Sequence, residues 1–490
     1  MSNRLHLQQI VQGRYGRRTA YTDVDVITEE NVVSVVAKAI GIHNTNKAVI
    51  KYLHDYKNGD QPIRYRNKVV RDDINNPIVE NHAWEIVRFK NGQTNGEPIQ
   101  CIATVDDDAI GKAVDKFNDY CKVAHKHARD ISSGEWTSAT GTGFKAVIRK
   151  KGEVPFAITV PSPMNTFIIY SSKTDEPMLA VQELKDDKGE QYLLCFSDTR
   201  EFQIQSGKLA DLVNADGSIV KSRLHAFGGI PIVEYPNNQD KVSDIELVID
   251  ILDAINNMQS NRMDAIEQFV QSWVKFVNCD IDEETFEKMK MMGALVVKSN
   301  NGSNNVDVDV MTQELNQTEA QVAKDDLWNN ALTISAIPNK QGNTGGDTQG
   351  AVELRNGWDF SKQAAKLHDP YVVESEKRLN KIILNVIRQA GVEECNFGIM
   401  DYDVQISHSP TDNMQVKAQV FQMLVSAGIH PLIAIKTCGL WTDAEKVFLL
   451  SQPYLDALYQ TIDEKIAELG LQEQEEKAKA LAEDFQKSIG

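Results

Sequence analysis

The sequence predicts an α+β protein that is mainly helical and contains several domains. Residues 241–277 hold neither glycine nor proline, and their apolar side chains recur every three or four residues, as on one side of a helix. Residues 144–236 instead carry alternating and β-branched runs separated by turn sequences, which is typical of a β-rich portion. A length of 490 residues suffices for roughly two to four domains.

The part of the chain before the β-rich portion is expected to be mostly helical. Helices are predicted at 28–40, 44–57 and 106–129, whereas residues 82–90 fit either a helix or a strand. Residues 1–20 contain four arginines and no acid, so we expect a flexible N-terminal arm there.

The glycine-free stretch is expected to form one side of a stalk. As a single helix, residues 241–277 would extend about 55 Å and would need a long neighbour. A short acidic helix at 280–292 and strands at 294–299 and 306–311 follow, and the second strand alternates strictly. A returning helix at 312–337 then gives a stalk capped by a small α/β tip.

The last third of the chain is expected to return to helices after a break. Residues 338–350 contain four glycines and predict a mobile loop. A helix at 351–390 should kink just before Pro370. A strand is expected at 403–407, and residues 411–490 are predicted to be almost wholly helical, with a solvated acidic end.

The composition of the chain indicates which kinds of partner and site are not expected. The net charge is −18 and the sequence pI about 5.1, which argues against tight gripping of duplex DNA. The six cysteines include no C-x-x-C pair, which suits reduced thiols rather than disulfides or a zinc site. No apolar run approaches the ~20 residues that span a bilayer, so no membrane is expected.

Signals for catalysis are weak. The glycine-rich segment 342–350 lacks the Gly-Lys-Ser/Thr of a phosphate-binding loop. His125 and His127 face apart on a helix, and the acids at 106–108 favour a helix start over a metal site. Ser407-His408-Ser409 lacks a positioned third group. We therefore expect no enzyme, no cofactor and no metal.

Four stretches resemble the portal proteins of tailed bacteriophages, in the branch common in phages of Gram-positive hosts. Their order and spacing carry the likeness. They are Tyr52–Gly59 with Ile63–Arg66; Asn75-Asn76-Pro77 leading to Trp84; Gly229–Asn238 with Ser243–Glu246, Ile251–Asn256 and Ser260-Asn261; and Gly350–Leu354 after the glycine-rich loop.

The resemblance implies a portal-type fold and a role in DNA transport. Such proteins form a ring, usually of twelve copies, at one capsid vertex, and double-stranded DNA passes through its channel during packaging and ejection. The implied partners are other copies of the chain, the terminase large subunit, the major capsid and scaffolding proteins and head-tail adaptor proteins. The implied location is the virion, after assembly in the host cytoplasm.

The resemblance also divides the chain. It implies an N-terminal arm (1–20), a wing (21–236), a stem helix (237–277), a clip (278–311), a second stem helix (312–338), a tunnel loop (339–350), a kinked wing helix and strand (351–412) and a helical crown with an acidic tail (413–490).

Particular residues follow from this division. The DNA-facing tunnel loop would present Lys340, Gln341, Asn343, Thr344, Asp347 and Thr348. The channel would be lined by Asp244, Asp253, Arg262, Glu267 and Lys324. The clip would face the terminase and the adaptors with Asp280, Asp282, Glu283, Glu284 and Glu287. An acidic channel repels phosphates and lets DNA slide. The cations among these residues could equally be ordinary solvated side chains, and the loop could be a plain linker.

Two other functions stay open at this point. The same stalk could assemble a cytoplasmic helical scaffold or adaptor that never conducts DNA. A metal-dependent nuclease using the acids at 106–108 is a less favoured alternative.

Overall fold

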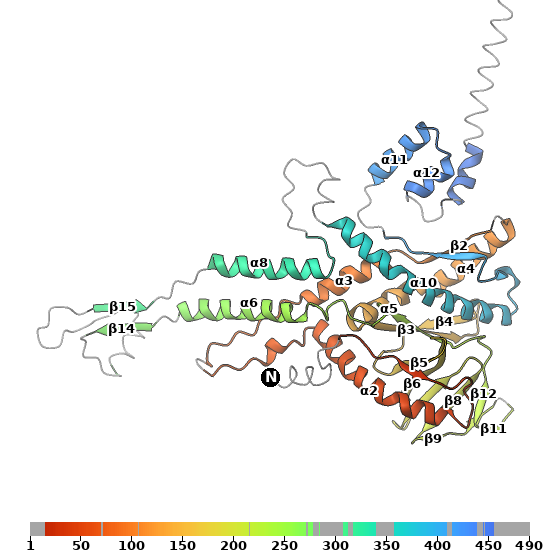
Figure 1. Cartoon of the computed structure of the whole chain (residues 1–490), viewed down its shortest axis with the longest axis horizontal. Helices are drawn as coiled ribbons and strands as arrows, with labels where there is room; N and C mark the ends of the chain where they lie inside the picture. Colours follow the sequence, from red (N-terminus) through yellow and green to blue (C-terminus); the bar gives the residue numbers. More distant parts are fainter. Residues whose placement is uncertain are drawn as a thin grey trace, which may run out of the picture.

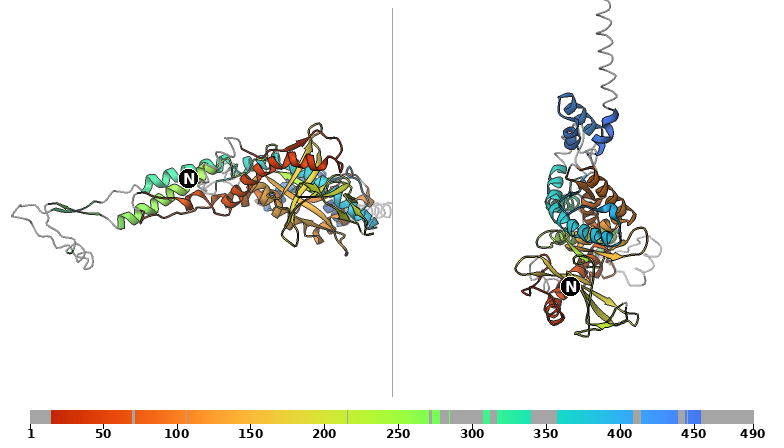
Figure 2. Two further views of the ribbon diagram at one scale, coloured as in Figure 1. Left: turned by 90° about the horizontal axis from the view of Figure 1, so that it is seen from below. Right: turned by 90° about the vertical axis from the view of Figure 1, so that its right-hand side faces the viewer.

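The computed structural model describes residues 15–69, 72–105, 107–214, 216–270, 273–277, 284, 307–311, 317–339, 357–408, 414–438, 444 and 446–454. A body of helices and sheets carries a narrow arm built on α6 (Ile249–Val270) and α8 (Gln317–Ile334), as Figures 1 and 2 show. The expected mainly helical α+β architecture is confirmed.

The β-rich portion forms the largest sheet of the body. Its strand order is β1-β5-β6-β7-β8-β12, with β9 paired to β8. These strands are β1 (Ala20–Thr22), β5 (Thr166–Ser171), β6 (Pro177–Lys185), β7 (Gln191–Phe196), β8 (Arg200–Gln205), β9 (Lys208–Leu209) and β12 (Ser222–Leu224); β10 (Leu212–Val213) and β11 (Ile219–Val220) form a separate hairpin. The strand β1 joins the sheet parallel to β5 from far away in the sequence.

One long helix packs on this sheet. α2 (Val32–Lys57) buries Val32, Val35 and Val36 against Ile169 and Leu179 of the sheet. The sequence predicted two helices here, but Gly41 does not break the helix. Its conformational cost of about 1 kcal/mol is outweighed by packing on both sides.

A second core joins a small sheet to the longest of the described helices. The sheet order is β13-β3-β4, from β13 (Ile232–Pro236), β3 (Thr142–Arg149) and β4 (Phe156–Thr159). α10 (Trp358–Gln389) and α4 (Asp108–Val123) contribute to this core, and Pro370 lies inside α10. η2 (Glu393–Cys395) follows α10, and β16 (Tyr402–Gln405) pairs with β2 (Gln100–Ala103). The expected strand at 403–407 is thus confirmed near its predicted place.

The base of the arm shares a third core with the body. Leu252 and Ile255 of α6 and Leu332 of α8 pack with Leu53 of α2 and Ile86 of α3 (His82–Asn95). Residues 82–90, ambiguous in sequence, are therefore helical. The short helix η1 (Pro62–Tyr65) follows α2 in the sequence and leads toward the base of the arm.

Three predicted helices differ from the structure. Residues 106–129 divide into α4 and α5 (Lys126–Thr140), because His125 adopts a left-handed backbone with φ of 54°. The second stem helix ends at Ile334, and Ala336 there has φ of 52°. The third helix begins at Trp358, and residues 351–356 lie outside the described residues.

The predicted helix at 241–277 is too long at both ends. Residues 241–248 cross α5 instead, where the Asp244 amide donates to the Ser138 carbonyl at 3.0 Å and Lys241 has φ of 54°. At the far end, β14 (Trp273–Val277) pairs with β15 (Asp307–Met311), which confirms the strand predicted at 306–311. The aromatic and β-branched composition of residues 273–277 favours the strand.

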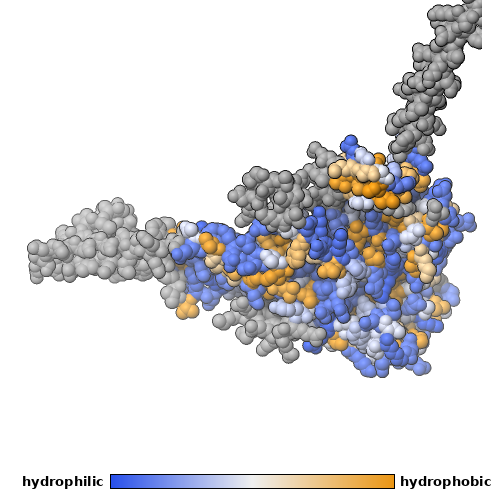
Figure 3. Space-filling model, turned by 45° about the horizontal axis from the view of Figure 1, so that its top comes forward, coloured by the Kyte–Doolittle hydropathy of each residue, from blue (hydrophilic) through white to orange (hydrophobic). Residues whose placement is uncertain are grey.

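Two short helices lie beside the body, away from the arm. They are α11 (Met414–Ser426) and α12 (Pro431–Cys438), and exposed apolar side chains gather over them (Figure 3). Lys446 reaches back to Asp115 of α4 at 2.6 Å. Among the described helices, none combines the length and apolarity that crossing a bilayer requires.

Four buried charges meet where α5, β3 and α10 come together. The ammonium of Lys145 donates to Asp130 and, at 2.7 Å, to Glu376, and Lys126 contacts the same two carboxylates at 2.8 and 2.9 Å. The Tyr235 hydroxyl adds a hydrogen bond to Glu376 at 3.0 Å. Burial acts to raise the pKa of Glu376, but the charges of Lys126 and Lys145 outweigh it and lower the pKa to about 2.

Removing one cation from this cluster should strongly destabilise the body. Lys145→Met would leave two buried carboxylates with one cation, a loss of about 3–5 kcal/mol for a broken buried pair. Denaturant titration followed by tryptophan fluorescence measures it. The matched control, Lys377→Met, removes the exposed pair with Asp403 and should cost about 0–1 kcal/mol. Equal losses in both variants would contradict this account.

Candidate functional site

The arm is the part of the molecule that the sequence singled out as a channel element. The chain runs out along α6, turns back through the antiparallel pair β14 and β15, and returns along α8 (Figure 1). Trp273 lies opposite Met311 at the inner end of this pair, and Val277 lies opposite Asp307 at the outer end.

The contact between α6 and α8 changes character along the arm. At its base, Leu252 and Ile255 are buried with Ala331 in the third core. Farther out the contact becomes polar: Arg262 donates to Gln321 at 2.7 Å, and Lys324 donates to Gln259 at 3.2 Å. Polar bonds therefore fix the register of the outer half, where apolar burial is lost.

A segment that follows α2 lies along one side of α6 and binds its polar residues. The Tyr56 hydroxyl donates to Asp253 at 2.9 Å, and the backbone amide of Glu80 donates to Asn256 at 2.8 Å. The amide of Ile78 donates to the Ser260 hydroxyl at 2.9 Å. We call residues 58–69 and 72–80 the strap; Tyr56 itself belongs to the last turn of α2.

Asp264 is the main anchor of the strap near the outer end of α6. Its carboxylate contacts Arg66 at 3.0 Å and Lys68 at 2.5 Å and accepts from the Asn76 amide at 2.8 Å. Burial acts to raise the pKa of Asp264, but hydrogen bonds from Lys68 and Asn76 and the charge of Arg66 lower it overall. Asn76 also donates to Glu267 at 2.6 Å.

The strap corrects the prediction for the channel-lining residues. Asp253 is buried against Tyr56, so the expectation that it lines a channel is wrong. Asp244 lies on the body, where it accepts from Ser138 at 2.6 Å, and not on the arm. The polar side of α6 is partly covered because the backbone of the strap needs hydrogen-bond partners.

The other predicted channel residues lie on the arm but already have partners. Glu267 accepts from Asn76, Arg262 donates to Gln321, and Lys324 pairs with Glu80 of the strap. Arg262 and Lys324, the two cations of the predicted channel lining, therefore make their contacts within the chain.

The exposed face of α8 was not among the features predicted from the sequence. Glu319, Val322, Asp326 and Asn330 recur every three or four residues and are all exposed. This face carries two acids, and Lys324, which lies between them in sequence, turns toward Glu80. Helical spacing applied to the acids of α8 could have identified this face from sequence.

Most predicted loop and tip residues lie outside the described residues. This applies to Lys340, Gln341, Asn343, Thr344, Asp347 and Thr348, and to Asp280, Asp282, Glu283 and Glu287. Glu284 is described and is exposed. Their predicted roles stay predictions.

The weak catalytic signals have structural explanations. Asp107 accepts from the Ala109 amide at 2.8 Å and caps α4, as the helix-start interpretation requires. His127 bonds the Asn95 carbonyl at 2.9 Å. His408 lies between two partners: its Nε2 is 2.7 Å from the Asp369 carboxylate, and its Nδ1 is 2.9 Å from the Gln93 carbonyl. The hydrogen bond with Asp369 raises the pKa of His408. Within the described ranges, no group of three or more metal-ligating side chains comes together.

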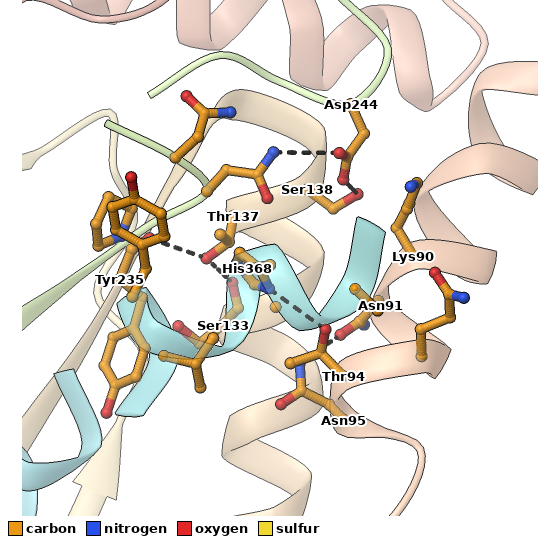
Figure 4. Close-up of a pocket in the computed structure, with 18 of the residues that line it drawn as sticks. Lys90, Asn91, Thr94, Asn95, Ser133, Thr137, Ser138, Tyr235, Asp244 and His368 are labelled. Atoms are coloured by element: carbon orange, nitrogen blue, oxygen red, sulfur yellow. Dashed lines mark hydrogen bonds between the residues drawn. The ribbon is translucent and has the colours of Figure 1, made fainter. Parts of the chain in front are cut away.

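A polar cavity of about 240 Å³ lies in the body between α3, α5, α10 and the end of β13 (Figure 4). Lys90, Ser133, Asp244 and His368 line it, with several amide and hydroxyl side chains. Most of the amides are engaged within the wall: Asn91, for example, donates to the Ile131 carbonyl at 2.9 Å and accepts from Asn95 at 2.8 Å.

Comparison with known families settles the family of the chain. A family described as phage portal protein, SPP1 Gp6-like, matches residues 37–477. The chain belongs to this portal family. It is thus a portal protein, a component of the capsid vertex of the phage particle.

Solved particle structures show a distant likeness to this portal protein. Structures described as the neck of an empty GTA particle with C6 symmetry and the virion of a native gene transfer agent particle each align with a TM-score of 0.46 and 10% identity. The first alignment covers 74% of this chain and 90% of the other, and the second 80% and 94%. None of the curated proteins matches this chain.

The strap should detach when its anchor loses charge. Asp264→Asn would leave Arg66 and Lys68 without their shared anion, which should weaken the strap by about 3–5 kcal/mol. Hydrogen exchange of residues 61–80 measures this, and we expect it to accelerate by at least tenfold while the sheet β5–β8 keeps its protection. Asp326→Asn on the exposed face of α8 is the matched control. Unchanged exchange in the strap of the Asp264 variant would show that the anchor lies elsewhere.

Proposed function

We propose that copies of this portal protein form a ring whose central channel conducts double-stranded DNA into the capsid during packaging and out of it during ejection. Family membership supports this proposal, and twelve copies is the number that the family resemblance implies. The observation that carries it is the exposed face of α8, which presents Glu319 and Asp326 while Lys324 bonds Glu80 instead.

An acidic wall suits a conduit better than a binding site. Phosphates of duplex DNA carry one charge per about 1.7 Å, so a wall rich in cations would hold the duplex through many contacts. A wall with carboxylates and neutral amides offers no such contacts and lets the duplex slide. The net charge of −18 per copy acts in the same direction.

The arm carries apolar side chains that a neighbouring copy could cover. Met263 and Ile266 of α6 are exposed apolar side chains on this arm. Burying one such side chain fully contributes about 1.5–3 kcal/mol. Contacts of this kind between adjacent arms would hold the ring around the channel.

The parts of the chain keep the proposed assignments, with bounds adjusted where the structure describes them. In this proposal α6 and α8 form the stem, residues 21–236 and α10 the wing, and α11 and α12 the crown. The tunnel loop at 339–350 would face DNA, with Lys340 as its phosphate contact. The tip at 278–311 would be the clip.

The proposed partners follow from these positions. The acids of the clip, with Glu284 as the described example, would face a basic surface on the terminase large subunit and later on head-tail adaptor proteins. The wing and crown would meet the major capsid and scaffolding proteins during assembly in the host cytoplasm. In this proposal the chain has no catalytic activity of its own.

Electron microscopy of the purified protein tests the ring directly. We expect rings with an open axial channel into which the α6–α8 arms project. A closed, compact monomer with no self-association at any concentration would overturn the transport role. Rings without a channel would instead favour a scaffold or adaptor.

A positive charge on the exposed face of α8 should hinder DNA passage. Asp326→Lys would add one cation per copy to the channel wall, and the resulting phosphate contacts should lower the amount of DNA packaged per particle several-fold. Because salt screens such contacts, the defect should shrink as ionic strength rises.

The matched control for this substitution is Asp187→Lys, which makes the same change at an exposed position of the β6–β7 turn. It should leave packaging unchanged. Normal packaging by rings of the Asp326 variant at all salt concentrations would exclude α8 from the channel wall.

A further inference from the structure

Lys90 differs from the other enclosed cations of the body. Arg17, Lys57, Lys126, Lys145 and Lys241 are all buried, and each contacts a carboxylate of this chain. The half-buried Lys90 has no described carboxylate within ion-pair distance, and burial lowers its pKa.

Asp244 is the acid whose charge acts on the pKa of Lys90, but the two side chains do not form an ion pair. Its charge acts on Lys90 only from beyond contact distance. Its carboxylate accepts hydrogen bonds from Ser138 at 2.6 Å and from Asn237 at 3.2 Å. Asp130 also lines the cavity, but Lys126 and Lys145 neutralise it.

Two further polar atoms of the cavity wall lack partners among the described residues. They are the hydroxyl oxygen of Ser133, a residue that is 1% exposed, and Nε2 of His368. The Thr94 hydroxyl lies 3.4 Å from His368 Nδ1, and with this hydroxyl as donor Nε2 carries the imidazole proton. Figure 4 shows His368 and Ser133 on adjoining walls of the cavity.

These three groups share one chemical property. An ammonium, a hydroxyl and a protonated imidazole nitrogen all donate hydrogen bonds, so the missing complement is an oxygen acceptor with negative charge. Of the three, the Ser133 hydroxyl and His368 Nε2 are fully buried without acceptors among the described residues, which is unfavourable, whereas Lys90 is half-buried. A carboxylate that enters from outside the chain would relieve this cost.

The rim of the cavity suits a polypeptide rather than a free ion. Leu367 lines the cavity and is 77% exposed, and Phe360, two helical turns earlier on α10, is 58% exposed. Tyr371 continues this side of the helix one turn later. The side chains that flank an inserted acid would therefore meet an apolar surface.

We propose that this cavity receives an aspartate or glutamate side chain from a second copy of the chain. This inference rests on the proposed ring, in which neighbouring copies are held at high effective concentration. The chain has 70 acids against 52 lysines and arginines, so each copy has unpaired acids to offer. The inserted carboxylate would pair with Lys90, and the backbone beside it would accept from Ser133 and His368.

Zero-length cross-linking tests the contact. Rings assembled from equal amounts of ¹⁴N- and ¹⁵N-labelled chains are treated with a water-soluble carbodiimide, which joins an amine and a carboxylate in contact. We expect Lys90 in an amide link to an acid, in peptide pairs of mixed isotopes. Links from Lys90 confined to Asp244 of the same chain, or no link from Lys90 in intact rings, would overturn the inference.

Association measurements add a second test. Lys90→Met keeps the length of the side chain and removes its charge, and ring dissociation followed by mass photometry should occur at a protein concentration at least tenfold higher. Lys38→Met, at an exposed position of α2, should leave association unchanged. Thermal unfolding of the monomers checks that both variants fold, and equal association of both variants with wild type would contradict the proposal.

The outcomes separate this inference from the proposed function. Absence of rings in the wild type would refute the ring itself. Rings with a channel but with Lys90 unlinked would refute only the contact. Thermal stabilisation of wild-type monomer by acetate or inorganic phosphate that Lys90→Met abolishes would reassign the cavity to a small anion and overturn the role of the second copy.

Discussion

The buried charges of Lys126, Lys145, Asp130 and Glu376 are the constraint on which the body depends. They join α5 and β3, which are neighbours in the sequence, to α10, which follows far later in the chain. Ions in an apolar interior are tolerated only with complete pairing, so the cluster permits one relative placement of these elements. Tyr235 on β13 donates a hydrogen bond to Glu376, so the strand that leads to the arm is bound to the same network.

The direction of the arm follows from this placement. β13 ends at Pro236, and the following turn crosses α5 with Ser243 donating to the carbonyls of Ser138 and Ala139 at 3.0 and 2.8 Å. Arg17 and Glu246 form a buried pair at 2.5 Å that fixes the turn from the other side. The start of α6 is therefore fixed relative to the body, and the strap supports the outer half of the helix through its contacts with Asp264.

The distribution of charged side chains on the arm suits the proposed transport of DNA. Cations of the arm and of the strap make contacts within the chain, as Lys324 does with Glu80 and Lys68 with Asp264. The acids of α8 keep an exposed face. In the proposed ring, pairing the cations inward would leave a wall that repels phosphate without requiring a large excess of acids at any one position.

The sequence by itself indicated where most helical segments and the β-rich portion lie, and which family the chain resembles, because periodicity and local motifs are properties of neighbouring residues. It placed β15 and the return of the chain along α8 close to their observed bounds. It could not show that residues 241–248 leave the helix, since Lys241 adopts a left-handed conformation and pairs with Glu234, and the Asp244 amide bonds the Ser138 carbonyl of α5. Nor could it show that Asp253 is buried, because its partner Tyr56 lies nearly two hundred residues away. Which acids face outward was decided by the packing of the strap on α6, a contact between segments that no local pattern records.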